Sequence, residues 1–341
     1  MSPKNLTAKN KTHNYLLSKL KNKKILNIYK KFESYLNINE NFIVAVSGGP
    51  DSLALSFLSK IYSIKKCLNP KYIIVDHKLR KHSTVEAKYV KKKLNRISIN
   101  SDILTWNGVK PKKNIQSVSR YKRYNLLIAK AKKSKIHNIL IGHHMDDLFE
   151  NFFIRIIRGS GLKGLVSLDK KTQTEGINLI RPLLDFNKKD LIFISKFIFG
   201  SYVEDTSNKD DKFKRVKIRN FLKQLENEGL DKSKFLLTIK NLKSANKTIQ
   251  YYVKKNLSEN TVFDNKKKLY ILNNSFFHNS DEVNFRSFTE IIKLAGKKYY
   301  PVRGKKIEKV IKLIITKAQF KVTLGGCIIK KLNETIIVSK E

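Results

Sequence analysis

The stretch Phe42-Ile-Val-Ala-Val-Ser-Gly-Gly-Pro-Asp-Ser52 is the most informative feature of the chain. Its five apolar residues predict a buried strand, its glycines a tight turn, and the apolar spacing from Leu53 to Tyr62 a following helix. Glycines let a polyanion approach the backbone, and the helix N-terminus adds N–H donors and partial positive charge. The stretch therefore predicts a phosphate-chain site made by Ser47, Gly48, Gly49, Pro50, Asp51 and Ser52.

This turn is neither a Walker loop nor a dinucleotide-binding turn. No Gly-Lys-Ser/Thr follows the glycines, and the Gly-x-Gly-x-x-Gly spacing is absent. The turn resembles the Ser-Gly-Gly-x-Asp-Ser signature of the PP-loop ATP pyrophosphatases, which implies ATP as cofactor and its cleavage to AMP and pyrophosphate. A turn that only caps an ordinary helix is the alternative.

Length and charge limit the class of protein. A chain of 341 residues suggests two domains. The formal net charge of +43, from 71 Lys+Arg against 28 Asp+Glu, predicts a polyanionic partner, with nucleic acid as the first candidate. Only 11 of the 71 are Arg, so a bias toward AT-rich codons accounts for part of this charge.

The chain shows no sign of a membrane or an oxidising compartment. No apolar run reaches the ~18–20 residues that span a bilayer, so we expect no membrane association. The lysine-rich N-terminus lacks the apolar core of a secretory signal. Cys67 and Cys327 lie far apart in sequence and form no metal-binding pair, which favours a cytoplasmic location.

Strand and helix patterns alternate through the first two thirds of the chain. This alternation predicts an α/β fold with a parallel sheet covered on both faces, whose ligands bind at the carboxyl ends of the strands. The expected strands are Phe42–Val46, Tyr72–Asp76, Asp102–Trp106 and Asn138–Ile141, and the expected helices are Ser52–Lys65, Thr84–Arg96 and Ser117–Lys133.

The alternation stops near residue 215, where a smaller helical or α+β domain is expected to begin. We therefore expect a basic helical segment at 1–40, a catalytic domain at 41–215 and a second domain at 216–341. The expected elements of the second domain are helices within 216–258 and near 284–295 and 304–317, and strands Lys268–Leu272, Phe320–Leu324 and Glu334–Ser339.

A second cluster of polar residues, Gly142-His-His-Met-Asp-Asp-Leu-Phe-Glu150, follows the last expected strand of the sheet. His143, Asp147 and Glu150 have the spacing of one helix face. The carboxylates could hold Mg²⁺ that bridges phosphates or bind an ammonium substrate, and His143 could carry a proton or stabilise charge. The alternative is acidic residues that merely favour a helix N-terminus. Zinc is disfavoured, because adjacent histidines face different ways.

Two further groups lie near these motifs in the chain. Asp76 ends the second expected strand and could accept hydrogen bonds from a ribose or an adenine amino group, while Arg80 could reach a phosphate or a nucleic-acid backbone. Arg155 and Arg158 precede a glycine-rich loop. Then come Arg181-Pro-Leu-Leu, Glu204-Asp-Thr-Ser-Asn208, and Arg215 and Arg219, one helical turn apart. A structural loop and a solvated basic face are the alternatives.

In this order, the six motifs resemble the tRNA(Ile)-lysidine synthase family, with Asn151 and Thr206 in place of a usual Thr and Pro. The resemblance implies an adenine nucleotide alpha hydrolase-like fold. It also implies a reaction in which ATP activates C2 of the wobble cytidine of a CAU-anticodon isoleucine tRNA. L-lysine then displaces AMP, and the tRNA reads AUA instead of AUG.

The resemblance also implies roles for individual residues. Asp51, His143, Asp147 and Glu150 would be catalytic, with Asp147 and Glu150 binding lysine and Asp51 a ligand of Mg²⁺. The phosphate loop and Asp76 would bind ATP. The tRNA would contact Arg80, Arg155, Arg158, Arg215, Arg219 and the second domain, and a homodimer is possible.

Other members of the superfamily and a non-enzyme remain alternatives. A PP-loop tRNA thiolase needs a catalytic cysteine or an iron–sulfur cluster, and neither cysteine lies in a suitable motif. Amide-forming PP-loop ligases act on small molecules and do not need so basic a chain. A non-catalytic RNA-binding protein with a degenerate ATP site is the third alternative, which intact Asp51, Asp147 and Glu150 disfavour.

Overall fold

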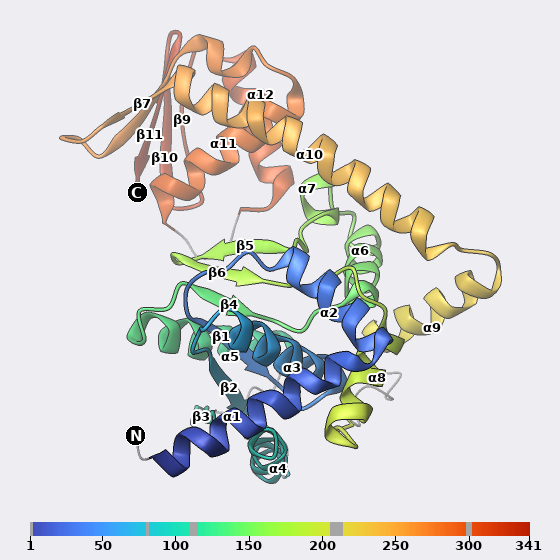
Figure 1. Ribbon diagram of the computed structural model, residues 1–341. Coiled ribbons are helices and arrows are strands. Elements are labelled where there is room, and N and C mark those ends of the chain that lie inside the picture. The colour runs from blue at the N-terminus through green and yellow to red at the C-terminus, as the bar shows by residue number, and fades with distance from the viewer. Residues whose placement is uncertain (1–2, 80–81, 109–114, 205–213, 298–301) are drawn as a thin grey trace. The chain divides into compact units, whose positions relative to one another are not determined.

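The structure, a computed structural model, describes residues 3–79, 82–108, 115–204, 214–297 and 302–341 (Figure 1). The chain divides into two compact units, residues 1–230 and 231–341. The helices of the first unit are α1 (Pro3–Ser18), η1 (Lys19–Lys21), α2 (Lys23–Tyr35), α3 (Pro50–Lys65), α4 (Ser83–Asn95), α5 (Ile115–Lys133), α6 (Met145–Ile157), α7 (Leu162–Leu165), α8 (Lys188–Phe199) and α9 (Lys214–Asn227). Its strands are β1 (Phe42–Val46), β2 (Lys71–Asp76), β3 (Ser101–Thr105), β4 (Asn138–Leu140), β5 (Lys171–Thr174) and β6 (Ile177–Ile180).

The six strands form one sheet in the order β3-β2-β1-β4-β6-β5. All neighbours are parallel except β5, which pairs antiparallel with β6 at the edge. The expected α/β class with a parallel sheet is thus confirmed. β1 lies between β2 and β4, and the direction of the strand order reverses there, which is where ligands of such sheets bind, beside the carboxyl end of β1.

The two faces of the sheet carry separate apolar cores. Alternate residues of β1 point to opposite faces, as expected of a strand. Phe42, Val44 and Val46 join a core with helices α2, α3, α4 and α8, whereas Ile43 joins a core with α5. Burial on both faces explains the almost continuous apolar sequence of this strand.

The N-terminal helices belong to the first unit. The Asn22 side chain caps α2 by accepting from the backbone N–H groups of Lys24 and Ile25 at 3.0 and 3.2 Å. Tyr29 and Phe32 on α2 are fully buried in the same core as α3. The basic segment at the N-terminus is therefore a covering layer of this unit.

The β5–β6 hairpin has no counterpart among the expected strands. β5 reads Lys-Thr-Gln-Thr and is mostly exposed, so it carries no apolar signal. Its turn uses Glu175 and Gly176, both with positive φ (52° and 80°), which suits a two-residue hairpin.

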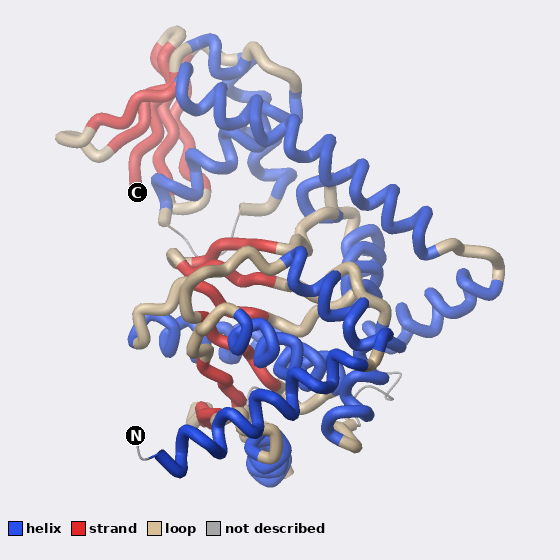
Figure 2. The backbone as a smooth tube through the Cα atoms, in the orientation of Figure 1, coloured by secondary structure: helices blue, strands red, loops and turns tan. Residues whose placement is uncertain are grey.

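The second unit is an antiparallel sheet with helices packed on it (Figure 2). Its elements are α10 (Lys232–Asn260), β7 (Thr261–Asp264), β8 (Leu269–Leu272), η3 (Asn274–Phe277), α11 (Asp281–Gly296), α12 (Gly304–Thr316), β9 (Gln319–Leu324), β10 (Cys327–Leu332) and β11 (Thr335–Lys340). The strand order is β7-β8-β11-β10-β9. The expected strands correspond to β8, β9 and β11, whereas β7 and β10 were not anticipated.

The compact units do not coincide with the boundaries expected at residues 40 and 215. Helix α9 packs on α6, where the rings of Phe153 and Phe221 lie 5.7 Å apart, so contacts extend the first unit to residue 230. The division into three functional domains stays a prediction.

The end of α11 gives a test of packing in the second unit. A Cβ on Gly296 would lie 2.3 Å from the carbonyl oxygen of Gly325, while one on Gly304 would meet only Phe285 at 3.5 Å. We expect Gly296→Ala to lower the free energy of unfolding by about 1–3 kcal/mol, the usual cost of overpacking. Gly304→Ala is the matched control, and thermal unfolding that does not distinguish the two variants would contradict this packing.

Candidate functional site

The phosphate loop and the His-Asp-Asp motif meet at the reversal point of the sheet. The loop follows β1, and the motif follows the neighbouring strand β4. The two segments are in close contact, because a Cβ on Gly142 would lie 3.2 Å from the backbone carbon of Asp51 and 3.2 Å from the backbone nitrogen of Ser52.

Gly48 and Ser52 shape the phosphate loop. Gly48 has a φ of +87°, and a Cβ there would lie 2.3 Å from Cγ2 of Val90. The Ser52 hydroxyl accepts hydrogen bonds from the backbone N–H groups of Ser47 and Gly48 at 3.1 and 3.0 Å and donates to the Gly49 carbonyl at 3.0 Å. The Ser52 hydroxyl therefore stabilises the turn through three hydrogen bonds to its backbone.

Open space lies beside the loop at Gly49. A Cβ on this residue would meet no atom within 4 Å. Gly49 is the N-cap of α3, and Pro50 occupies its first turn, so the helix presents N–H groups that lack an acceptor within the helix. The donors, the space and the helix dipole suit an anion such as a phosphate chain.

Asp51 pairs with a residue that the sequence analysis did not identify. Lys188, the first residue of α8, donates from Nζ to both carboxylate oxygens of Asp51 at 2.8 and 2.6 Å. The one available signal was a lysine at a helix N-terminus, where a positive charge is unfavourable.

His144 lies between two carboxylates. Its Nε2 is 3.8 Å from Oδ2 of Asp51 and 3.6 Å from Oδ2 of Asp147. Its Nδ1 accepts from the Asp146 backbone N–H at 3.2 Å, and the Asp147 carboxylate accepts from the His144 backbone N–H at 3.0 Å, which makes a capping box for α6.

His143 is neutral at pH 7 and contacts two arginines. Burial lowers its pKa from the ordinary 6.5 to about 3; Asp147 opposes this shift, while Arg120 and Arg181 add to it. Nδ1 accepts from Nε of Arg181 at 3.1 Å, which places the ring proton on Nε2. The guanidinium of Arg120 lies 3.4 Å from Nε2. A role in which His143 stabilises negative charge as a cation is therefore disfavoured near neutral pH.

Asp147 is a partly buried carboxylate that stays ionised. Burial alone would raise its pKa, but His144 and His143, the His144 backbone N–H and Arg215 lower the pKa to about 2. Asp147 therefore presents a negative charge at any physiological pH.

Glu150 is almost fully buried and pairs with Arg219 of α9 through Nε–Oε1 and NH2–Oε2 hydrogen bonds. Burial raises the pKa of Glu150, and Arg219 opposes the rise. The side chain expected to bind lysine is thus paired with the side chain expected to bind tRNA.

The Asp76 carboxylate accepts hydrogen bonds from the segment that follows it in the chain. It accepts from the Lys78 backbone N–H at 3.0 Å and from the hydroxyls of Ser83 and Thr84 at 2.8 and 2.6 Å. Burial would raise the pKa of Asp76, but the hydrogen bonds from Thr84, Lys78 and Ser83 lower it. These bonds join the end of β2 to the start of α4.

The other expected tRNA contacts lie around this edge of the unit. Arg155 is half-buried in the last turn of α6, and Arg158 is exposed just beyond it. Arg215 is exposed in the first turn of α9 and is near enough to lower the pKa of Asp147. Arg80 and the segment Asp205–Asn208 lie outside the described residues.

The described residues contain no group of three His, Cys, Asp or Glu side chains that could hold a metal by itself. Any Mg²⁺ at Asp51 would therefore need oxygens from a bound phosphate chain. Among the two cysteines, Cys67 is exposed and Cys327 is buried in the second unit. No helix in the described part of the chain is long and apolar enough to cross a membrane.

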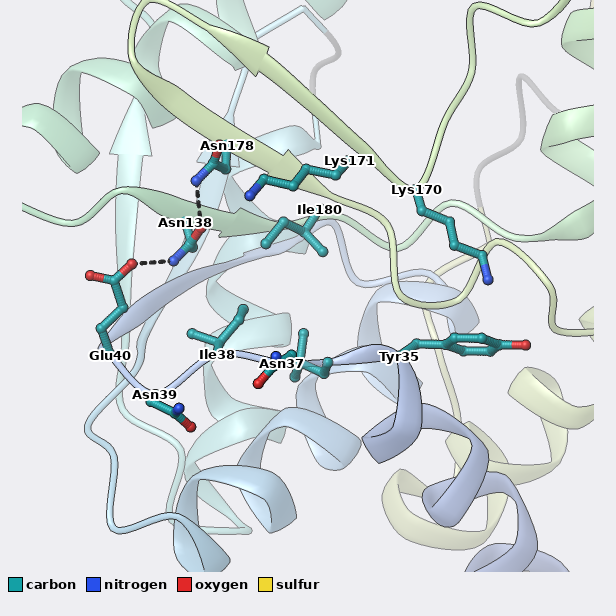
Figure 3. A pocket seen from close by; sticks show the side chains of 11 residues that line it. Tyr35, Asn37, Ile38, Asn39, Glu40, Asn138, Lys170, Lys171, Asn178 and Ile180 are labelled. Atoms are coloured by element: carbon teal, nitrogen blue, oxygen red, sulfur yellow. Dashed lines mark hydrogen bonds between the residues drawn. The ribbon is translucent and has the colours of Figure 1, made fainter. Parts of the chain in front are cut away.

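A cavity of about 620 Å³ lies near the amino ends of β1 and β4 (Figure 3). Asn178 donates to Asn138 at 2.9 Å, and Asn138 donates to Glu40, so its polar wall is already hydrogen-bonded. None of the predicted site residues lines it. We therefore place the candidate site at the opposite edge, where the motifs converge.

Comparisons with known proteins identify the family to which these motifs belong. Residues 17–226 match the PP-loop domain family. A tRNA(Ile)-lysidine synthase of Wolbachia sp. subsp. Brugia malayi is 32% identical over 306 residues, which are 89% of this chain and 71% of the relative. The tRNA(Ile)-lysidine synthase of Rickettsia akari is 31% identical over 340 residues, which are 92% and 74% of the two chains.

A solved structure shares the fold. The U34-tRNA thiolase NcsA from Methanococcus maripaludis, with its [4Fe-4S] cluster, matches with a TM-score of 0.56 and 18% identity over 64% of this chain and 78% of its own. This likeness supports the fold alone. The matched PP-loop domain and the identity to these relatives over most of their length show that the chain belongs to the tRNA(Ile)-lysidine synthase family.

Proposed function

We propose that this protein is an ATP-dependent carbon–nitrogen ligase that joins L-lysine to C2 of the wobble cytidine of a CAU-anticodon isoleucine tRNA. The observation that carries the proposal is the meeting of the glycine turn after β1 with the carboxylates of Asp147 and Glu150 after β4. One end of this site suits ATP, and the other suits a cationic amino acid. Family membership supports the same reaction.

The ATP end would consist of Ser47, Gly48, Gly49 and the first turn of α3. Cytosine O2 is a poor leaving group, and adenylation converts it to AMP, which leaves readily. Mg²⁺, when bound to phosphate oxygens and Asp51, would supply charge neutralisation. Ser52 would keep the turn in its binding shape, because its hydroxyl holds two loop N–H groups.

The lysine end would centre on Asp147. Its ionised carboxylate suits one amino group of lysine in the ammonium form. The other amino group, which attacks C2 of the cytidine, must be neutral. Glu150 would take part after exchange of its Arg219 partner for substrate. His143 would act by holding Arg181 in place, since its neutral ring accepts the Arg181 hydrogen bond at Nδ1.

The tRNA would lie on basic surfaces of both units. Arg155, Arg158 and Arg215 are the candidates in the first unit. In the second, helix α10 exposes Lys240, Lys247, Tyr251 and Lys254 at spacings of seven, four and three residues, which puts them on one face. A cytoplasmic location, favoured by the cysteine pattern, and a homodimer are further proposals.

Labelled lysine tests the reaction. Incubation with radiolabelled L-lysine, ATP and bulk tRNA should transfer label to tRNA and release AMP and pyrophosphate. Asp147→Asn should reduce transfer by roughly 30-fold or more through loss of the charge that holds lysine, while Asp146→Asn, the matched neighbour on α6, should retain it. No transfer by the wild type, or a requirement for a sulfur donor, would overturn the proposal.

Substitution of the two loop glycines should affect different properties, ATP binding for Gly49 and stability for Gly48. Gly49→Ala should leave thermal unfolding unchanged, because a Cβ there meets nothing, but weaken ATP binding by filling the phosphate space. Gly48→Ala should lower the free energy of unfolding by about 1–3 kcal/mol, through a strained φ and the contact with Val90. Calorimetry and ATP titration measure both effects, and equal unfolding temperatures for the two variants would contradict this geometry.

The neutral His143 predicts a pH dependence of stability. The unfolded chain protonates this ring as the pH falls below about 6.5, whereas the folded chain does so only near pH 3. Stability contributed by neutral His143 is therefore present above pH 6.5 and lost as the pH falls toward 3, with a slope of up to about 1.4 kcal/mol per pH unit. Denaturant unfolding of His143→Gln should show a shallower loss from pH 6.5 to 4, and parallel curves for the variant and wild type would refute the assignment.

A further inference from the structure

Lys188 contacts the centre of the candidate ATP site, yet none of the sequence motifs gives it a role. Its Nζ binds both oxygens of Asp51, at 2.8 and 2.6 Å. The Lys188 side chain is 33% exposed and that of Asp51 is 20% exposed. A ligand entering from solvent can therefore reach this ion pair.

The position of Lys188 is unfavourable for helix α8 alone. As the first helical residue, it places a positive charge at the positive end of the helix dipole, which is unfavourable. Leu191 and Ile194 of α8 are fully buried in the core that contains Leu55 and Leu58 of α3. Core packing therefore holds the N-terminus of α8, with Lys188, beside the first turn of α3.

The charges at the site also point to an anionic ligand. Asp51 adds a carboxylate next to a loop suited to phosphates, and this carboxylate alone would repel a triphosphate of about four negative charges. Lys188 neutralises Asp51. An ammonium group has three N–H donors, so Lys188 can retain Asp51 and also donate to a phosphate oxygen.

We propose that Lys188 binds the phosphates of ATP beyond the α-phosphate and that Asp51 positions its ammonium for this task. This inference deepens the proposed function and rests on its use of ATP. In the adenylation step, cytidine O2 bonds to the α-phosphorus while the bond from that phosphorus to the bridging oxygen breaks. The electron pair leaves with pyrophosphate, whose growing charge the Lys188 ammonium stabilises.

Nucleotide binding to Lys188→Met tests this assignment. Calorimetric titration should show an ATP dissociation constant about tenfold higher than that of the wild type, a change of about 1.4 kcal/mol. The dissociation constant for AMP, which lacks the outer phosphates, should not change. Lys188→Arg should restore most of the ATP affinity, and Lys189→Met, which removes the exposed neighbouring charge, should match the wild type.

The Asp51→Asn variant separates two effects of Lys188, direct contact with phosphate and neutralisation of the Asp51 charge. In Asp51→Asn, the additional change Lys188→Met should still weaken ATP binding about tenfold. A loss that disappears in this background would overturn the proposal, as would equal weakening of ATP and AMP or no weakening. A wild type that binds neither nucleotide would contradict it as well. Absence of lysine transfer with the expected nucleotide affinities would overturn only the proposed function.

Discussion

The left-handed backbone of Gly48 is the constraint on which the candidate site depends. At a φ of +87°, the chain turns from β1 into α3 within a few residues, and Val90 fills the space where a side chain would stand. The turn is then held by the Ser52 hydroxyl and by a hydrogen bond from the Val203 backbone N–H to the Gly48 carbonyl at 3.0 Å. Val203 follows α8, the helix that begins with Lys188. The same turn therefore orders the loop and links it to the helix that supplies the Asp51 partner.

A second constraint is the strand order. Since β1 pairs in parallel with β4, the segments that follow the two strands lie in contact at one edge of the sheet. The acidic side chains brought there are each close to a basic or titratable group: Asp51 to Lys188, Asp147 to His144, and Glu150 to Arg219. Burial of a carboxylate without such a partner would be costly. Each of these carboxylates therefore has a basic or titratable neighbour before any substrate binds.

Local pattern was sufficient for most elements of the first unit. The strands at Phe42–Val46 and Tyr72–Asp76 carry strong apolar runs and were expected within one residue of β1 and β2. The β5–β6 hairpin was missed because β5 is polar and lies at the edge. Lys188 was missed for a different reason: it lies 137 residues from Asp51 in sequence, and no spacing rule connects them. The same holds for Arg219 and Glu150, which were assigned to different ligands but form one pair.

Local sequence was sufficient for the glycine turn between β1 and α3, the α/β class and the helical spacing of Asp147 and Glu150, because each depends on residues close together in the chain. His143, expected on the same helix face, instead lies before the N-cap of α6. Only the tertiary structure decided what those groups contact. Packing of the chain brought Arg181 into hydrogen-bond contact with His143 and Lys188 into contact with Asp51. It also directed the Asp76 carboxylate to donors in the loop that follows β2. Such partners depend on strand order and helix packing, and a charge in a buried site takes its properties from whichever group the fold brings within a few ångströms.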